Sequence, residues 1–148
     1  MFGIFKDLFH RSALSRSAKG TSDVSFSKAE KAVLRGLDVD KVMTDHHAWK
    51  NKISAYVSGN SLEYLRPDIV GMNHRCDLGR WIMASQHTVL GTSPLFERLK
   101  LEHQNFHFHA SYIVSYTHAG KLAEAEKLWN EGFENSSKRL IALLDQMR

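Results

Sequence analysis

Cysteine, proline and long apolar runs are scarce in this sequence of 148 residues, which has one cysteine and two prolines. A single cysteine cannot form an internal disulfide, which excludes a small secreted domain held together by disulfides. No apolar run approaches the ~18 residues of a membrane-spanning helix. Lysine and arginine exceed aspartate and glutamate by only 20 to 16 and form no long basic run, so nucleic-acid binding is not expected.

The first 25 residues differ in composition from the rest of the chain. Residues 1–11 place apolar side chains on one side at helical spacing, which predicts a short amphipathic helix. Lys6 and Asp7 interrupt this stretch too early for a secretory signal peptide. Residues 12–25 are rich in serine, lysine, arginine and glycine, which is typical of a flexible linker. We therefore expect residues 1–25 to be an extension of the domain, with two interpretations left open: residues 1–11 contact a partner or, weakly, a membrane surface, or the segment packs on the bundle or is disordered.

The remaining residues, 26–148, are expected to form one domain whose pattern is helical throughout. Ser27 and Glu30 form a capping-box pair, and Ser93 followed by Pro94 marks another helix start. Helices are predicted at about 27–36, 38–58, 76–86, 93–119 and 122–147, while Pro67 should break any helix within 59–73. Short connections between amphipathic helices predict an all-α protein, an antiparallel four-helix bundle with an additional short helix.

The last of these helices carries apolar and small residues at heptad-like spacing, which predicts one continuous helix packed on the bundle. The stripe consists of Ala125, Trp129, Phe133, Ser136, Leu140, Leu143 and Met147.

Four side chains are candidate metal ligands: His46, Cys76, His103 and His107. His103 and His107 share one face of a predicted helix because they are four residues apart. His46 lies on the apolar stripe of another helix, one turn before Trp49, and Cys76 begins a third. Three imidazoles and a thiolate would be a complete ligand set for tetrahedral zinc, whereas a di-iron bundle would need paired carboxylates that this sequence lacks.

Spacing alone leaves a second interpretation open. With nine histidines in the chain, a chance His-x-x-x-His pair is unremarkable, and a single histidine on an apolar stripe is more often an ordinary core residue. The other histidines are interpreted as solvated or bonded to the backbone. They are His10, His47, His74, His87, His109 and His118.

The ligand patterns resemble those of the bacterial chemoreceptor zinc-binding domain family, from about residue 38 to the C-terminus. The family fingerprint is His-x-x-aromatic, then Cys-x-Leu-Gly-x-Trp, then His-x-x-x-His. The matching residues here are His46 with Trp49, Cys76 with Leu78, Gly79 and Trp81, and His103 with His107. The resemblance implies a four-helix bundle that binds one zinc ion through three histidines and a cysteine. Trp49, Asp77, Gly79 and Trp81 are then expected around these ligands.

The resemblance also implies a cytoplasmic regulatory module, often dimeric, of the kind found in chemoreceptors and diguanylate cyclases. Such domains are associated with sensing zinc and oxidants, hypochlorous acid in particular. This chain has no receptor signalling hairpin and no cyclase motif, so we expect a stand-alone sensor. Its output would pass through a homodimer or through a signalling protein such as a chemoreceptor or a diguanylate cyclase.

Cys76 is the candidate redox switch, because zinc would hold it as the thiolate that oxidants attack. An alternative is a sensor of zinc occupancy, in which the cysteine serves only as a ligand. A zinc hydrolase is disfavoured, because four protein ligands leave no open coordination position for substrate or water. We therefore expect a non-enzymatic zinc protein.

Overall fold

A computed structural model describes residues 24–148 of the chain. The expected amphipathic helix and all but the end of the expected linker lie outside the described residues. Among residues 24–148 every regular element is helical, and there is no strand. The α-helices are α2 (Lys28–Leu34), α3 (Val39–Val57), α4 (Pro67–Val70), α5 (Asp77–Ser85), α6 (Pro94–His118), α7 (Leu122–Leu128) and α8 (Glu134–Asp145).

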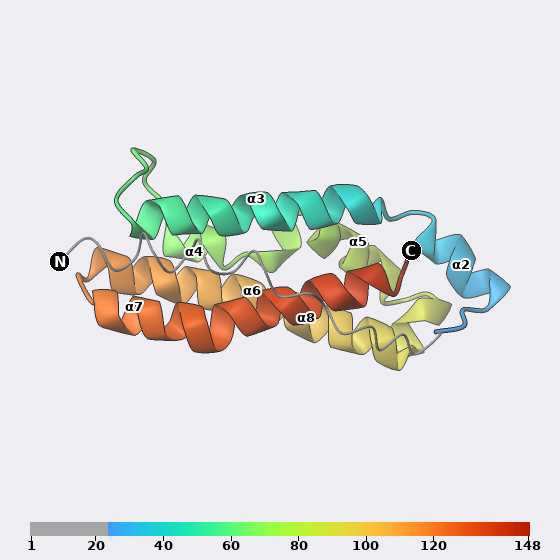
Figure 1. The fold of residues 1–148 in the computed structure, drawn as a ribbon. Coiled ribbons are helices and arrows are strands. Elements are labelled where there is room, and N and C mark those ends of the chain that lie inside the picture. The colour runs from blue at the N-terminus through green and yellow to red at the C-terminus, as the bar shows by residue number, and fades with distance from the viewer. Residues whose placement is uncertain (1–23) are drawn as a thin grey trace.

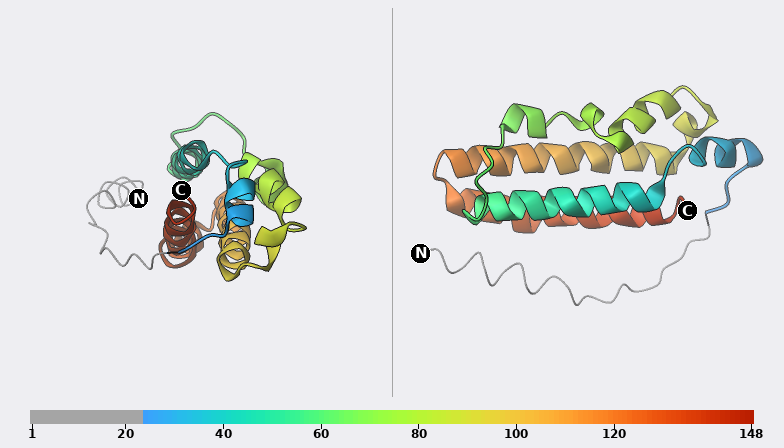
Figure 2. Two further views of the ribbon diagram at one scale, coloured as in Figure 1. Left: turned by 90° about the vertical axis from the view of Figure 1, so that its right-hand side faces the viewer. Right: turned by 90° about the horizontal axis from the view of Figure 1, so that it is seen from above.

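The helices pack lengthwise as a bundle, which confirms the expected all-helical architecture. Figure 1 shows α3 and α6 running in one direction and α7 with α8 running in the other. The fourth side is made of short pieces, α4, a 3-10 turn at Asn73–Arg75 and α5, as the end-on view in Figure 2 shows. Helix α6 contacts α3, α4, α7 and α8, so it lies at the centre of the bundle's packing.

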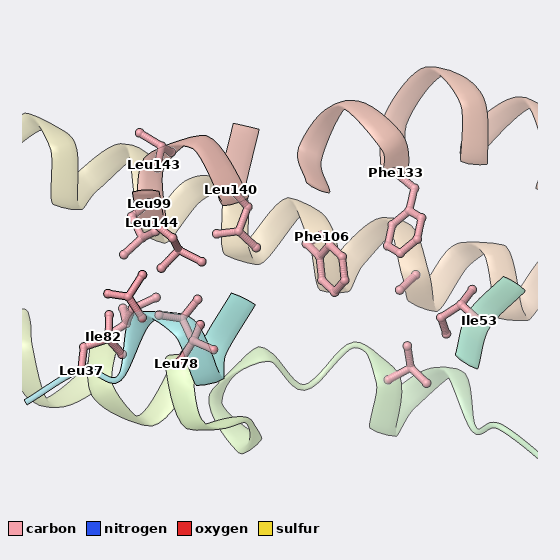
Figure 3. Packing of buried hydrophobic residues seen from close by; sticks show 14 of the residues in the cluster. Leu37, Ile53, Leu78, Ile82, Leu99, Phe106, Phe133, Leu140, Leu143 and Leu144 are labelled. Carbon is pink, nitrogen blue, oxygen red and sulfur yellow. The ribbon is translucent and has the colours of Figure 1, made fainter. Parts of the chain in front are cut away.

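The core between these helices is apolar and tightly enclosed. Phe96, Leu99, Phe133 and Leu140 are all 0% exposed, and Phe106 is 2% exposed. Figure 3 shows Phe106 and Phe133 facing one another from α6 and the segment before α8, with ring centroids 4.8 Å apart. This aromatic pair matters for function because Phe106 lies on the same helix as His103 and His107.

Several helix ends follow from local sequence. The Ser27 hydroxyl accepts a hydrogen bond from the Glu30 backbone N–H at 3.2 Å, and the Glu30 carboxylate accepts one from the Ser27 N–H at 2.8 Å, so the capping box is confirmed. Gly59 and Gly120 end α3 and α6 with φ of 70°, a backbone conformation that favours glycine.

No helix passes through Pro67, as expected, but the four-residue helix α4, which begins at Pro67, was not predicted; a proline's missing N–H costs nothing at that first position. The last helix was expected to be regular throughout. The chain is helical from Leu122 to Asp145, but Trp129–Phe133 forms a π-helical turn between α7 and α8. Ala125, Trp129 and Phe133 are spaced four residues apart, which is more than the 3.6 residues of one α-helical turn. In a regular α-helix these side chains would therefore rotate away from a common face. The π-helical turn has more residues per turn and keeps all three side chains in the core.

Candidate metal centre

The four candidate ligands meet inside the bundle, from α3, the start of α5 and α6. His46, His103 and His107 are 4%, 2% and 6% exposed, and one ligand atom from each of the four residues lies within 4.8 Å of the others. Cys76 Sγ is 3.1 Å from His103 Nε2 and 3.7 Å from His107 Nε2. Zinc bonds of about 2.3 Å to sulfur and about 2.0–2.1 Å to nitrogen put tetrahedral ligand atoms about 3.3–3.6 Å apart, so these residues fit a zinc ion.

Two of the imidazoles are held so that Nε2 faces the centre of the site. The Nδ1–H of His46 donates to the Val42 carbonyl at 2.8 Å, and the Nδ1–H of His107 donates to the Val70 carbonyl at 2.8 Å. A ring nitrogen facing a carbonyl carries the proton, which leaves Nε2 with a free lone pair. His46 Nε2 is buried and has no hydrogen-bond partner among residues 24–148, and a bound cation would supply that partner.

Burial keeps the imidazoles in the neutral form that a metal requires. Desolvation lowers the pKa of His46 to about 4 and the pKa of His103 to about 2, and it also lowers the pKa of His107. Burial raises the pKa of the Cys76 thiol, and this effect outweighs the Gly79 backbone N–H, which lowers it. In the absence of a cation the sulfur is therefore favoured as a thiol, and a bound divalent ion would favour the thiolate.

Backbone geometry places Cys76 at the start of α5. Its Sγ accepts a hydrogen bond from the Gly79 N–H at 3.3 Å, so the cysteine serves as the N-cap of that helix. Its thiol donates to the Asn73 carbonyl at 3.4 Å. A Cβ on Gly79 would lie 1.8 Å from that same carbonyl oxygen, so only glycine allows the turn before α5 to approach this closely.

The residues expected around the ligands take different roles. Gly79 contacts the sulfur, as described above. Trp49 lines a surface cavity together with His46 and Cys76. Asp77 is exposed and pairs with Lys41 and Arg80, which lowers its pKa, the Lys41 hydrogen bond contributing most.

Trp81 packs edge-on against Phe96, with ring centroids 5.9 Å apart, and Phe96 lies two helical turns before His103. Sequence reasoning missed Phe106, which contacts His46 with ring centroids 5.1 Å apart. It shares a helical stripe with His103, so its burial was predictable, but its contact with a residue of α3 was not.

This arrangement defines a helical protein with one cysteine sulfur and three imidazole nitrogens positioned to hold a metal ion. Comparison with known families matches residues 46–114 to the chemoreceptor zinc-binding domain. The matched segment contains all four ligand candidates, so residues 46–114 carry the features of a chemoreceptor zinc-binding domain. No curated protein and no solved structure gave a match. Within residues 24–148, no helix combines the length and apolarity needed to cross a membrane.

Proposed function

We propose that this chain is a cytoplasmic regulatory protein in which zinc, held by His46, Cys76, His103 and His107, keeps Cys76 reactive toward oxidants such as hypochlorous acid. The observation that carries the proposal is the position of the only cysteine, whose Sγ lies among three buried imidazoles. Zinc supplies the charge that stabilises the thiolate at neutral pH.

The chemistry at Cys76 balances without a second cysteine. The thiolate sulfur attacks the chlorine of hypochlorous acid, forming an S–Cl bond as hydroxide leaves. Water then replaces chloride on the sulfur and releases a proton, so thiolate and hypochlorous acid become sulfenic acid and chloride. The sulfur loses two electrons, and the chlorine gains them.

Oxidation of the sulfur would disturb the start of α5. Cys76 Sγ lies 3.1 Å from His103 Nε2 and accepts the Gly79 N–H hydrogen bond at 3.3 Å, and a neutral sulfenic acid is a weaker metal ligand and hydrogen-bond acceptor than a thiolate. We propose that α5 shifts, and that the shift passes to a second copy of the chain or to a partner signalling protein.

The test is to treat zinc-loaded protein with one equivalent of hypochlorite and to measure released zinc and the mass of the peptide that contains Cys76. We expect zinc release to parallel oxidation of Cys76. A Cys76→Ala variant loaded with zinc controls for oxidation of methionine and tryptophan. Retention of zinc with an unmodified Cys76 would rule out the redox function.

A sensor of zinc occupancy is the second candidate. Two features favour it: His46 Nε2 has no hydrogen-bond partner among residues 24–148, and the pKa values of His46 and His103 are depressed. A metal-free site with these features is costly, and zinc binding would order the bundle. A zinc titration that changes hydrogen exchange around α5, together with indifference to hypochlorite, would select this function.

A further inference from the structure

A cavity of about 300 Å³ lies beside the metal centre, between α3 and the start of α5. Its lining includes His46 and Cys76 from the centre, and Ala48 and Trp49 from α3. His46 is only 4% exposed, whereas Cys76 is partly exposed, so the cavity borders the more accessible ligand of the centre. A cavity of this size admits a small molecule of several heavy atoms.

The charged residues at this cavity do not cancel. Asp45, Asp77, Arg75 and Arg80 line it, and Lys41 bonds to both carboxylates, to Asp45 at 2.7 Å and to Asp77 at 2.5 Å. Three cationic groups therefore face two carboxylates, which leaves one positive charge in excess.

That excess charge is attributable to Arg75. Arg80 pairs with Asp77 and also donates to the Arg75 carbonyl. The Arg75 guanidinium has no carboxylate partner among residues 24–148, and its polar side-chain contact is the Met72 sulfur at 3.9 Å. Arg75 directly precedes Cys76 in the chain, and both residues line the cavity together with Arg80, whose charge opposes the rise in the pKa of the Cys76 thiol. Arg75 is exposed, so its attraction for anions is strongest at low ionic strength.

We propose that this cavity is the entrance through which small oxidants reach Cys76, and that Arg75 makes it selective for anions such as hypochlorite. The inference rests on the proposed reactivity of Cys76 and adds the route and the charge of the reagent. Inside the cavity hypochlorite takes a proton from water to give hypochlorous acid and hydroxide, and hypochlorous acid then oxidises the thiolate by the steps given above.

Steric access is tested with an Ala48→Trp variant, which fills the cavity from an exposed helical position. Asn51→Trp is the matched control, because Asn51 is exposed on the same helix and does not line the cavity. The readout is the rate at which Cys76 of metal-free, full-length protein reacts with methyl methanethiosulfonate, a neutral probe, followed by mass spectrometry. The single cysteine makes the label unambiguous.

We expect Ala48→Trp to slow labelling on the order of tenfold, since thiol reaction rates depend on access, and Asn51→Trp to leave it unchanged. Circular dichroism and zinc content show that both variants are folded. If Cys76 were labelled at the same rate in both variants, the cavity would not be the route to the sulfur.

Charge selectivity is tested with Arg75→Glu and with Lys121→Glu, an equal change at the exposed N-cap residue of α7; α7 begins at the far end of the bundle from α5 (Figure 1). The probes are the 2-sulfonatoethyl and 2-aminoethyl methanethiosulfonates, which are anionic and cationic. Arg75→Glu should lower the ratio of anionic to cationic labelling rates about fivefold at low ionic strength. Lys121→Glu should leave the ratio unchanged. A ratio that Arg75→Glu does not move would overturn the role of Arg75.

The same variants, loaded with zinc, are then treated with hypochlorite. Slower Cys76 oxidation in Ala48→Trp and in Arg75→Glu, but in neither control, supports the inference. Cavity-dependent labelling in metal-free protein, combined with no hypochlorite oxidation of the zinc-loaded wild type, would instead overturn the proposed redox function. The two failures are therefore distinguishable.

Discussion

The two sides of the bundle that meet at the metal centre are built differently. On one side, α6 and α8 are long helices joined by fully buried apolar side chains such as Leu99 and Leu140 (Figure 3). On the other, α4, the turn at Asn73–Arg75 and α5 are short pieces. Here backbone carbonyls make the decisive contacts, from Val70 to His107 and from Asn73 to Cys76.

This difference assigns the ligands to distinct mechanical roles. His103 and His107 lie within a 25-residue helix that contacts most of the bundle, so they form a rigid base. Cys76 is the N-cap of the nine-residue helix α5, which is anchored in the core by buried Leu78 and Ile82. The ligand that we propose to react with oxidants therefore lies on the side built from short elements.

The largest effect on these two sides is expected when zinc is removed. At free zinc near 1,000 times the dissociation constant, bound metal adds about 4 kcal/mol to the free energy of unfolding, so a chelator should remove that much. Denaturant unfolding with and without zinc measures it. Hydrogen exchange should increase more in α5 than in α8.

In a His103→Gln variant, zinc should no longer increase the free energy of unfolding, whereas in His109→Gln, on the same helix, it should still do so. If zinc still stabilised His103→Gln, the metal would bind elsewhere.

Gly79→Ala should disturb only the side of the bundle that consists of α4, the turn at Asn73–Arg75 and α5. Because the new Cβ would lie 1.8 Å from the Asn73 carbonyl, the turn must move, and we expect a loss of about 3 kcal/mol or more together with weaker zinc binding. Unfolding curves and zinc titration measure the two effects.

Leu140→Ala on the opposite side provides the contrast. The Leu140 side chain is 0% exposed, so its truncation should lower the free energy of unfolding by about 3–4 kcal/mol. Zinc affinity should stay unchanged. Equal loss of zinc affinity in both variants would contradict the division into two sides.

Acidification should destabilise the metal-free protein. A histidine in the unfolded chain, with its ordinary pKa of 6.5, takes up a proton before folded His46, whose pKa is about 4, so the unfolded state binds more protons in this window. Stability is therefore complete above pH 6.5 and falls as the pH drops toward 4, by about 3 kcal/mol from His46 alone.

Unfolding of metal-free protein measured between pH 7 and pH 4.5 checks this, with return to pH 7 to prove reversibility. A His46→Gln variant should show a shallower decline. A free energy of unfolding that stays constant over this range would contradict the burial argument.

The smallest effect is expected from Lys41→Gln. Lys41 connects α3 to α5 through Asp77 but is 53% exposed, and exposed ion pairs contribute little. The melting temperature should change by no more than about 2 °C. A much larger change would show that surface charges, rather than the Cys76 contacts, hold α5 in place.

Much of the fold was predictable from the sequence because helix ends are local. Ser27, Glu30 and Pro94 mark helix starts, and Gly59 and Gly120 mark ends. The helix at Pro67 was missed because the same residue that stops a helix internally begins one at its first position. The π-helical turn was missed because it results from the fit of Trp129 and Phe133 to the core.

The sequence by itself determined that His103 and His107 share a helix face, and that the chain has a single thiol and the residue types of a zinc site. Only the tertiary structure decided that Cys76 Sγ and His46 Nε2 reach that face, that the Val70 carbonyl orients His107, and that a cavity lined by Arg75 opens beside the sulfur. The reason is physical: spacing along one helix fixes neighbours a turn apart, whereas contacts between separate helices depend on how the whole core packs.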